Sequence, residues 1–183
     1  MILKVITSNM GKVREYRDAF APFGIVVEHL KVDYDEVQTS ELVEVVGKGM
    51  AHLKGMGMTD FIIDDSGLFI DPLNGFPGVF SAYALRTIGN TGVLRLMEDT
   101  DERSANFQCC IGCNISGKDV IVLGRCDGVI LRKETGTEGF GFDPIFSHDG
   151  KRSFAEIPIE EKNNISHRGN AVRLLMKEME RMI

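Results

Sequence analysis

Short apolar runs and amphipathic stretches alternate along the first half of the chain. The runs are rich in β-branched and aromatic residues, which favour strands, and the amphipathic stretches repeat at helical spacing. The predicted elements are strands at residues 3–7, 25–30, 61–64 and 68–71, and helices at about residues 12–22, 40–58 and, as one or two helices, 79–98.

The second half of the chain is dominated by strand-forming residues and turn signals. A Ser-Gly-Lys hairpin turn and an Asp-Gly turn separate its apolar runs, and a serine precedes the last amphipathic stretch as a helix cap. The predicted elements are strands at 106–115, 119–125, 129–132 and 144–146, turns at 116–118 and 127–128, and a helix that starts near Ser166.

This order predicts the fold class. Because helices alternate with strands at first and a meander follows, we expect an α/β fold in which flanking helices pack on a long mixed β-sheet. The sequence contains no internal repeat, linker or low-complexity tract. We therefore predict a single domain over residues 1–183.

Composition narrows the class of partners. The chain is 43% hydrophobic and 26% charged, as in ordinary globular proteins, and no apolar run approaches the roughly 18 residues of a membrane span. Its N-terminus reads as a strand rather than a signal peptide, so we expect a cytoplasmic protein without a membrane partner. The net charge of −6 argues against broad nucleic-acid binding but leaves room for a small phosphorylated ligand bridged by a cation.

Four cysteines lie close together in the sequence, at Cys109, Cys110, Cys113 and Cys126. On a regular strand Cys110 and Cys113 differ in parity and face opposite sides, so they would not chelate one ion together. We interpret the four as free thiols packed as small hydrophobic side chains, and reject a zinc site.

Two adjacent carboxylates, Asp64 and Asp65, follow an apolar run in the segment FIIDDSG. Neighbouring side chains on a strand face opposite sides, so these two cannot serve one purpose. At a predicted strand end over a glycine turn, one of them could face a cleft and hold a divalent cation, which prefers oxygen ligands. An ordinary exposed turn is the alternative.

A predicted strand-to-helix junction, TSNMGKVRE over residues 7–15, has the features of an anion site. The first N–H groups of a helix are unpaired, its dipole favours negative charge there, and Lys12 adds a full positive charge. The alternative is simple capping by Ser8 or Asn9 with Lys12 in solvent.

Two later segments suggest a ligand with a flat ring. In GFGFDPIF over residues 139–146, Phe140 and Phe142 could stack on a planar base, or could belong to the core. In KNNISHR over residues 162–168, His167 and Arg168 oppose the helix dipole at a helix start. We expect an anionic or acceptor-rich ligand to offset that cost.

These segments, together with the acidic loop DYDEVQ and the turn GFPGVFSA, stand in the order and spacing that resemble the inosine triphosphate pyrophosphatase family over nearly the whole chain. The resemblance implies two lobes around a long sheet, with a nucleotide in the central cleft, and a homodimer. It implies Mg²⁺-dependent hydrolysis of ITP, dITP or XTP between the α and β phosphorus atoms, which yields a monophosphate and pyrophosphate.

The resemblance also implies roles for individual residues. Asp65 would accept a proton from the attacking water, and Glu36 and Asp65 would bind Mg²⁺. The base and sugar would contact the segments GFGFDPIF and KNNISHR. The phosphates would contact the segment TSNMGKVRE, Lys48 and Ser66. The implied substrate-binding residues are Thr7, Ser8, Asn9, Met10, Gly11, Lys12, Lys48 and Ser66 for the phosphates, Phe140, Gly141, Phe142 and Asp143 for the base and sugar, and Lys162, His167 and Arg168 for the base edge.

The pattern departs modestly from the family, and two rival functions remain. Phe142 stands where relatives also have Tyr or Trp, so stacking is kept without a polar group. After GFPGVFSA many relatives have a basic residue, whereas this chain has Ala82-Tyr83, and Arg86 could supply the missing charge. A pyrophosphatase for modified pyrimidine nucleotides and a non-enzymatic nucleotide sensor are the rivals.

Overall fold

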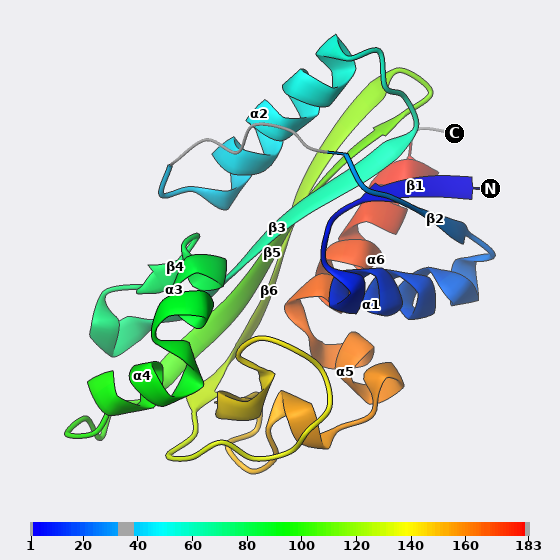
Figure 1. Ribbon diagram of the computed structural model, residues 1–183. Helices are drawn as coiled ribbons and strands as arrows, with labels where there is room; N and C mark the ends of the chain where they lie inside the picture. Colours follow the sequence, from blue (N-terminus) through cyan, green and yellow to red (C-terminus); the bar gives the residue numbers. More distant parts are fainter. Residues whose placement is uncertain (1, 33–38, 182–183) are drawn as a thin grey trace.

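The computed structural model describes residues 2–32 and 39–181, in which seven strands form one mixed sheet (Figure 1). The strand order is β2-β1-β3-β5-β6-β7, and β4 pairs with β3. The strands are β1 Ile2–Ile6, β2 Val26–Leu30, β3 Phe61–Ile70, β4 Pro77–Gly78, β5 Ser104–Ile115, β6 Lys118–Ile130 and β7 Phe146–Ser147.

Six α-helices lie in the described residues. Two of them, α1 and α2, connect the parallel strands β1, β2 and β3, as parallel neighbours require a long crossover. The prediction of helices between early strands is confirmed, and α6 begins after Ser166 as predicted, but α5 was not predicted. The helices are α1 Met10–Phe20, α2 Leu42–Gly55, α3 Ser81–Thr87, α4 Gly89–Leu96, α5 Ile159–Ile165 and α6 His167–Glu180.

The prediction of a strand end and turn at the acidic pair is wrong. β3 runs unbroken from Phe61 to Ile70 because it pairs with β5 along its whole length. The hydrogen bonds between β3 and β5 outweigh the preference of Asp-Ser-Gly for a turn. Gly67 serves a different purpose, since a Cβ there would lie 2.4 Å from the carbonyl oxygen of Gly78 on β4.

The predicted turn at Asp127-Gly128 is wrong for the same reason. β6 continues through it to Ile130, and a Cβ on Gly128 would lie 2.2 Å from the carbonyl oxygen of Ser147 on β7. The other predicted hairpin is confirmed: Ser116 and Gly117 have φ of 49° and 77°, the conformation of a tight two-residue turn between β5 and β6.

The long strands β3, β5 and β6 pass through two lobes, as Figure 1 shows. In one lobe α1 and α6 cover one face of the sheet and α2 covers the other, each over its own apolar cluster. In the other lobe α3, α4 and the chain around β7 enclose a third cluster that includes Leu68, Phe107 and Phe146. The predicted α/β class, long mixed sheet and two lobes are confirmed.

The sheet also separates the cysteines as predicted. All four are buried and free, and Cys110 packs in the cluster under α2 while Cys113 packs in the cluster under α1 and α6. Burial raises the pKa of each thiol to about 12. They are therefore protonated core residues.

Candidate active site

Six charged side chains form a continuous chain of alternating sign between the lobes, called here the ion-pair chain. Five of them are buried and Lys12 is partly buried. Lys12 Nζ and Arg168 Nη2 each lie 3.1 Å from Asp64 Oδ2. Lys162 Nζ lies 2.6 Å from a carboxylate oxygen on either side of it. In order, the ion-pair chain runs Lys12, Asp64, Arg168, Glu15, Lys162 and Asp143.

The ion-pair chain favours the charged forms of Glu15, Asp64 and Arg168 although their side chains are out of water. Burial acts to raise the pKa of the Asp64 and Glu15 carboxyls, but the neighbouring cations outweigh it and both pKa values lie below the usual range. For Asp143 burial prevails, and its pKa is raised. Burial acts to lower the pKa of Arg168, yet the two carboxylates hold it well above its ordinary value. Three cations thus balance three acids where a lone charge would be very costly.

At the N-terminus of α1, Asn9 caps the helix as the capping alternative states, but Lys12 is not in solvent as that alternative also required. Asn9 caps the helix, since its Oδ1 accepts from the N–H groups of Gly11 at 2.8 Å and Lys12 at 3.3 Å. Lys12 is not in solvent, because its ammonium group donates to Asp64. Ser8 and Met10 are exposed beside them.

The two phenylalanines of the glycine-rich loop have different surroundings. The Phe140 ring lies against Gly11, where a Cβ would approach it to 2.4 Å, and its N–H donates to Asp143 at 2.7 Å. Lys162 and Arg168 lie 5.2 and 5.8 Å from its ring centre, within the range of cation–π attraction. Phe142 is buried in the core of the second lobe, so the core alternative holds for that residue.

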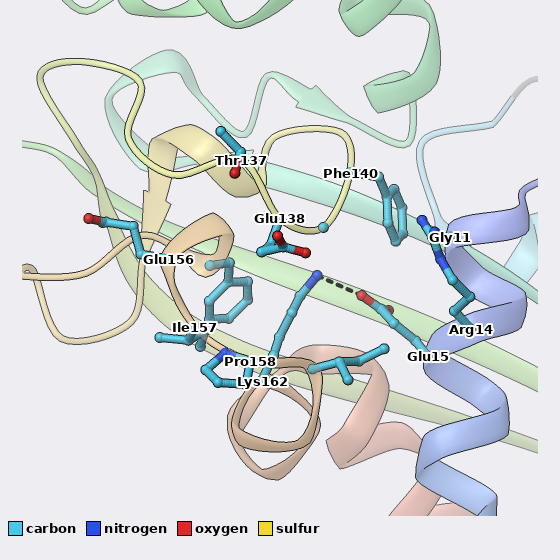
Figure 2. Close-up of a pocket in the computed structure, with 13 residues that line it drawn as sticks. Gly11, Arg14, Glu15, Thr137, Glu138, Phe140, Glu156, Ile157, Pro158 and Lys162 are labelled. Carbon is cyan, nitrogen blue, oxygen red and sulfur yellow. Dashed lines mark hydrogen bonds and ion pairs between the residues drawn. The ribbon is translucent and has the colours of Figure 1, made fainter.

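Two cavities meet at Phe140 and Lys162. Figure 2 shows the larger, of about 680 Å³, between α1, the loop at Thr137–Phe140 and the start of α5. The smaller measures about 120 Å³ and brings together all seven residues predicted to contact the base and sugar with the start of α1. It is lined by Asn9, Lys12, Ser66, Ser81, Ala82, Leu85, Phe107, Phe140, Gly141, Phe142, Asp143, Lys162, His167 and Arg168.

Asp65 lies on the other side of β3. Asp64 is paired in register with Ile111, which belongs to the cluster under α1 and α6, whereas Asp65 is paired with Cys110, which belongs to the cluster under α2. Paired residues share a face, so the two carboxylates point to opposite faces as predicted. Asp65 is half-buried and accepts from the N–H of Ser66 at 2.9 Å.

Several of the predicted site residues line neither of these two cavities. Lys48 is exposed on α2 and donates to Glu44 at 2.6 Å, and it lines neither of the two cavities described above. Glu36 lies outside the described residues, so its predicted meeting with Asp65 stays a prediction. Thr7 is half-buried beside the helix start, where its hydroxyl accepts from the Asn9 N–H at 3.1 Å.

His167 and Arg168 do not leave the helix start with an uncompensated charge. Arg168 is neutralised by Glu15 and Asp64, and burial lowers the pKa of His167 well below 6.5, so that it is neutral at pH 7. The expectation that a ligand must offset the cost of placing basic residues at a helix start is therefore wrong. The Glu15 and Asp64 carboxylates already neutralise the charge of Arg168. His167 stacks on Phe107, with ring centres 4.6 Å apart.

This burial predicts an effect of pH on stability. Because the folded pKa of His167 lies below the unfolded value of 6.5, the unfolded chain binds the extra proton first, and stability falls as the pH falls through 6.5. Between pH 7.5 and 5.5 we expect a loss on the order of 1 kcal/mol from this residue. Urea unfolding of the wild type and His167→Gln at both pH values measures it, and an equal pH dependence in the two proteins would contradict the expectation.

Sequence reasoning missed Glu15, the acid at the centre of the ion-pair chain. It looks like an ordinary surface acid of an amphipathic helix. The available signal was indirect, because basic residues at the start of α6 require carboxylates nearby.

A mixed sheet through two lobes, with a buried polar cleft between them, defines an α/β protein with a ligand site at the lobe junction. The chain belongs to the Ham1 family, whose model matches residues 3–178. It is 49% identical over 169 residues to the dITP/XTP pyrophosphatase of Pyrococcus horikoshii, covering 92% of this chain and 91% of that protein. It is 48% identical over 174 residues to the dITP/XTP pyrophosphatase of Thermococcus kodakarensis, covering 94% of each.

Solved structures agree with this assignment. The Ham1 protein of Staphylococcus aureus superposes with a TM-score of 0.82 at 29% identity and covers 100% of both chains. A HAM1 protein of Coxiella burnetii gives a TM-score of 0.81 at 31% identity, covering 98% of this chain and 99% of that one.

Proposed function

We propose that this protein hydrolyses ITP, dITP and XTP to the nucleoside monophosphate and pyrophosphate, and so removes deaminated purines from the nucleotide pool. One observation carries the proposal most directly: the small cavity places Phe140 beside the buried cations Lys162 and Arg168 and next to the start of α1. Its relatives named dITP/XTP pyrophosphatase support the same activity.

The cavity chemistry favours a base with an oxygen at C6. Lys162 and Arg168 have only hydrogen-bond donors, so a C6 carbonyl is a suitable acceptor, whereas the C6 amino group of adenine would meet them donor to donor. An unpaired buried donor costs about 1–3 kcal/mol, and more when charged. The cavity is smaller than the roughly 300–1,000 Å³ of usual ligand sites, so it suits the base rather than the whole nucleotide.

The start of α1 suits the phosphates. Helix N–H groups and the Lys12 ammonium group lie at one edge of the same cavity, with Ser66 beside them. We propose that they bind the triphosphate, and that Lys48 reaches its far end when the substrate is bound. Asp65 is proposed as the acceptor of the proton from the attacking water, which makes that water a better nucleophile.

We propose Mg²⁺ as the cofactor, held by Asp65 and Glu36. Within the described residues no three His, Cys, Asp or Glu side chains form a metal site. Mg²⁺ is commonly held by one or two carboxylates together with substrate phosphate oxygens, so a half-buried Asp65 fits it. When bound, it would neutralise phosphate charge and polarise the phosphoryl oxygens.

Release of pyrophosphate from ITP, XTP, GTP, ATP and dTTP, measured with Mg²⁺ present, tests the proposal. We expect kcat/KM for ITP and XTP to exceed that for ATP by roughly 100-fold, since several unpaired donors oppose adenine. Preference for dTTP would support the pyrimidine rival. Binding of ITP without turnover would support the sensor.

Replacing Lys12 with alanine tests the phosphate assignment. We expect kcat/KM for ITP to fall by roughly 100-fold or more, because a positive charge that stabilises the phosphates is lost. Lys54→Ala is the matched control, since Lys54 forms an exposed ion pair with Asp119 at the end of α2. An equally small change in both variants would refute the assignment of Lys12.

Two further properties belong to this proposal. Four free, buried cysteines suit a reducing compartment such as the cytoplasm. A homodimer is proposed as well, and the large exposed apolar side chains Phe76, Phe80, Tyr83 and Ile88 around α3 are candidates to be covered by it. Light scattering of the purified protein measures the mass directly.

In the described residues, no helix has the length and apolar character needed to cross a membrane.

A further inference from the structure

The groups proposed to bind phosphate are already occupied by the protein itself. The N–H groups of Gly11 and Lys12 donate to Asn9 Oδ1. The Lys12 ammonium group lies 3.1 Å from both the carboxylate Oδ2 and the backbone oxygen of Asp64. Two of the three N–H donors of Lys12 are thus engaged with Asp64, so an incoming phosphate competes with this carboxylate for the cation.

Asp64 is fixed more firmly than Lys12. Its Oδ2 receives Arg168 Nη2 at 3.1 Å, Ser66 Oγ at 3.2 Å and Cys109 Sγ at 3.6 Å in addition to Lys12. The Asp64 side chain is 0% exposed, whereas that of Lys12 is 15% exposed. When a polyphosphate binds Lys12, the lysine side chain can move toward it, whereas the Asp64 carboxylate is held in place by its other contacts.

We propose that Asp64 is a positioning residue that holds Lys12 back and so keeps the affinity for inorganic pyrophosphate low enough for this product to leave. The proposal rests on the proposed function, because it takes pyrophosphate as the product and Lys12 as a phosphate ligand. Separation of Lys12 from a buried carboxylate costs free energy in every phosphate complex, whether substrate or product. The base and sugar can offset that cost for the substrate, whereas pyrophosphate alone has no such contacts.

The ion-pair chain offers a matched control. Glu15 is an equally buried carboxylate that binds Arg168 and Lys162, and within residues 2–32 and 39–181 it makes no bond to Lys12. Asp64→Asn and Glu15→Gln remove the same charge from the same chain. Only the first removes the negative charge that Lys12 contacts, so the pair separates a local effect on Lys12 from a general rise in positive potential.

The test is calorimetric titration of inorganic pyrophosphate, with Mg²⁺, into the wild type and both variants, after thermal unfolding has shown that each is folded. We expect Asp64→Asn to bind pyrophosphate about tenfold tighter than the wild type, and Glu15→Gln to stay within about threefold. Asp64→Ser carries the same expectation if Asp64→Asn does not fold. In Lys12→Met the Asp64→Asn substitution should no longer tighten binding, since the lysine it frees is absent.

Steady-state kinetics with ITP gives a second readout. Slower product release should lower kcat and KM together in Asp64→Asn, whereas mere structural damage would not lower KM. Unchanged or weaker pyrophosphate binding in Asp64→Asn, or equal tightening in Glu15→Gln, overturns the proposal. Wild-type protein that does not hydrolyse ITP, dITP or XTP would instead refute the proposed function, and the two failures are thus distinguishable.

Discussion

Replacing Asp65 with alanine is expected to lower kcat for ITP by roughly 1,000-fold or more while nucleotide binding survives. Loss of a general base alone typically costs 10²–10⁴-fold, and this variant also loses a proposed Mg²⁺ ligand. The cavity beside Phe140 does not depend on Asp65, which faces the other side of β3. Pyrophosphate release measures kcat, and calorimetric titration of ITP measures binding.

The control for this variant is Asp119→Asn, which removes an exposed carboxylate at the start of β6. It should keep wild-type turnover. Full activity of Asp65→Ala would show that another group accepts the proton, and the proposed mechanism would be wrong. Equal loss of binding and turnover would mean that Asp65 is needed to form the site rather than to perform the chemistry.

Replacing Arg168 with methionine is expected to lower the free energy of unfolding by about 3–5 kcal/mol, the usual cost of removing one partner from a buried ion pair. The Arg168 side chain is only 1% exposed and binds both Glu15 and Asp64. Its loss leaves five members of the ion-pair chain, and the Glu15 and Asp64 carboxylates lack the cation that they shared. The preference for ITP over ATP should fall as well, because a donor at the base edge is gone.

Arg152→Met provides the comparison for stability. Arg152 pairs with Glu161, and their side chains are 52% and 42% exposed. An exposed pair of this kind contributes about 0–1 kcal/mol, so the variant should unfold almost like the wild type. Urea unfolding compares the three proteins, and similar losses in both variants would contradict a special role for the buried chain.

Sequence reasoning succeeded where local pattern and spacing carry the information. Alternation along β3 predicted that Asp64 and Asp65 face opposite sides, and parity along β5 predicted the separation of Cys110 from Cys113. Both follow from the two-residue repeat of a strand, which needs no knowledge of distant contacts. The same reasoning failed for FIIDDSG, where turn-forming residues lie inside a strand that β5 holds along its whole length.

The sequence by itself determined the alternation of helices and strands, the helix start beside Lys12 and the membership of a recognisable family of folds. Those features depend on side chains near each other in the sequence. Only the tertiary structure decided the state of the charges. The paired residues Glu15 and Lys162 are 147 residues apart in the sequence, and Lys12 and Asp64 are 52 apart. Their pairing depends on how α1, β3 and α5 pack. Burial then makes each charge depend on its partner, which no local pattern records.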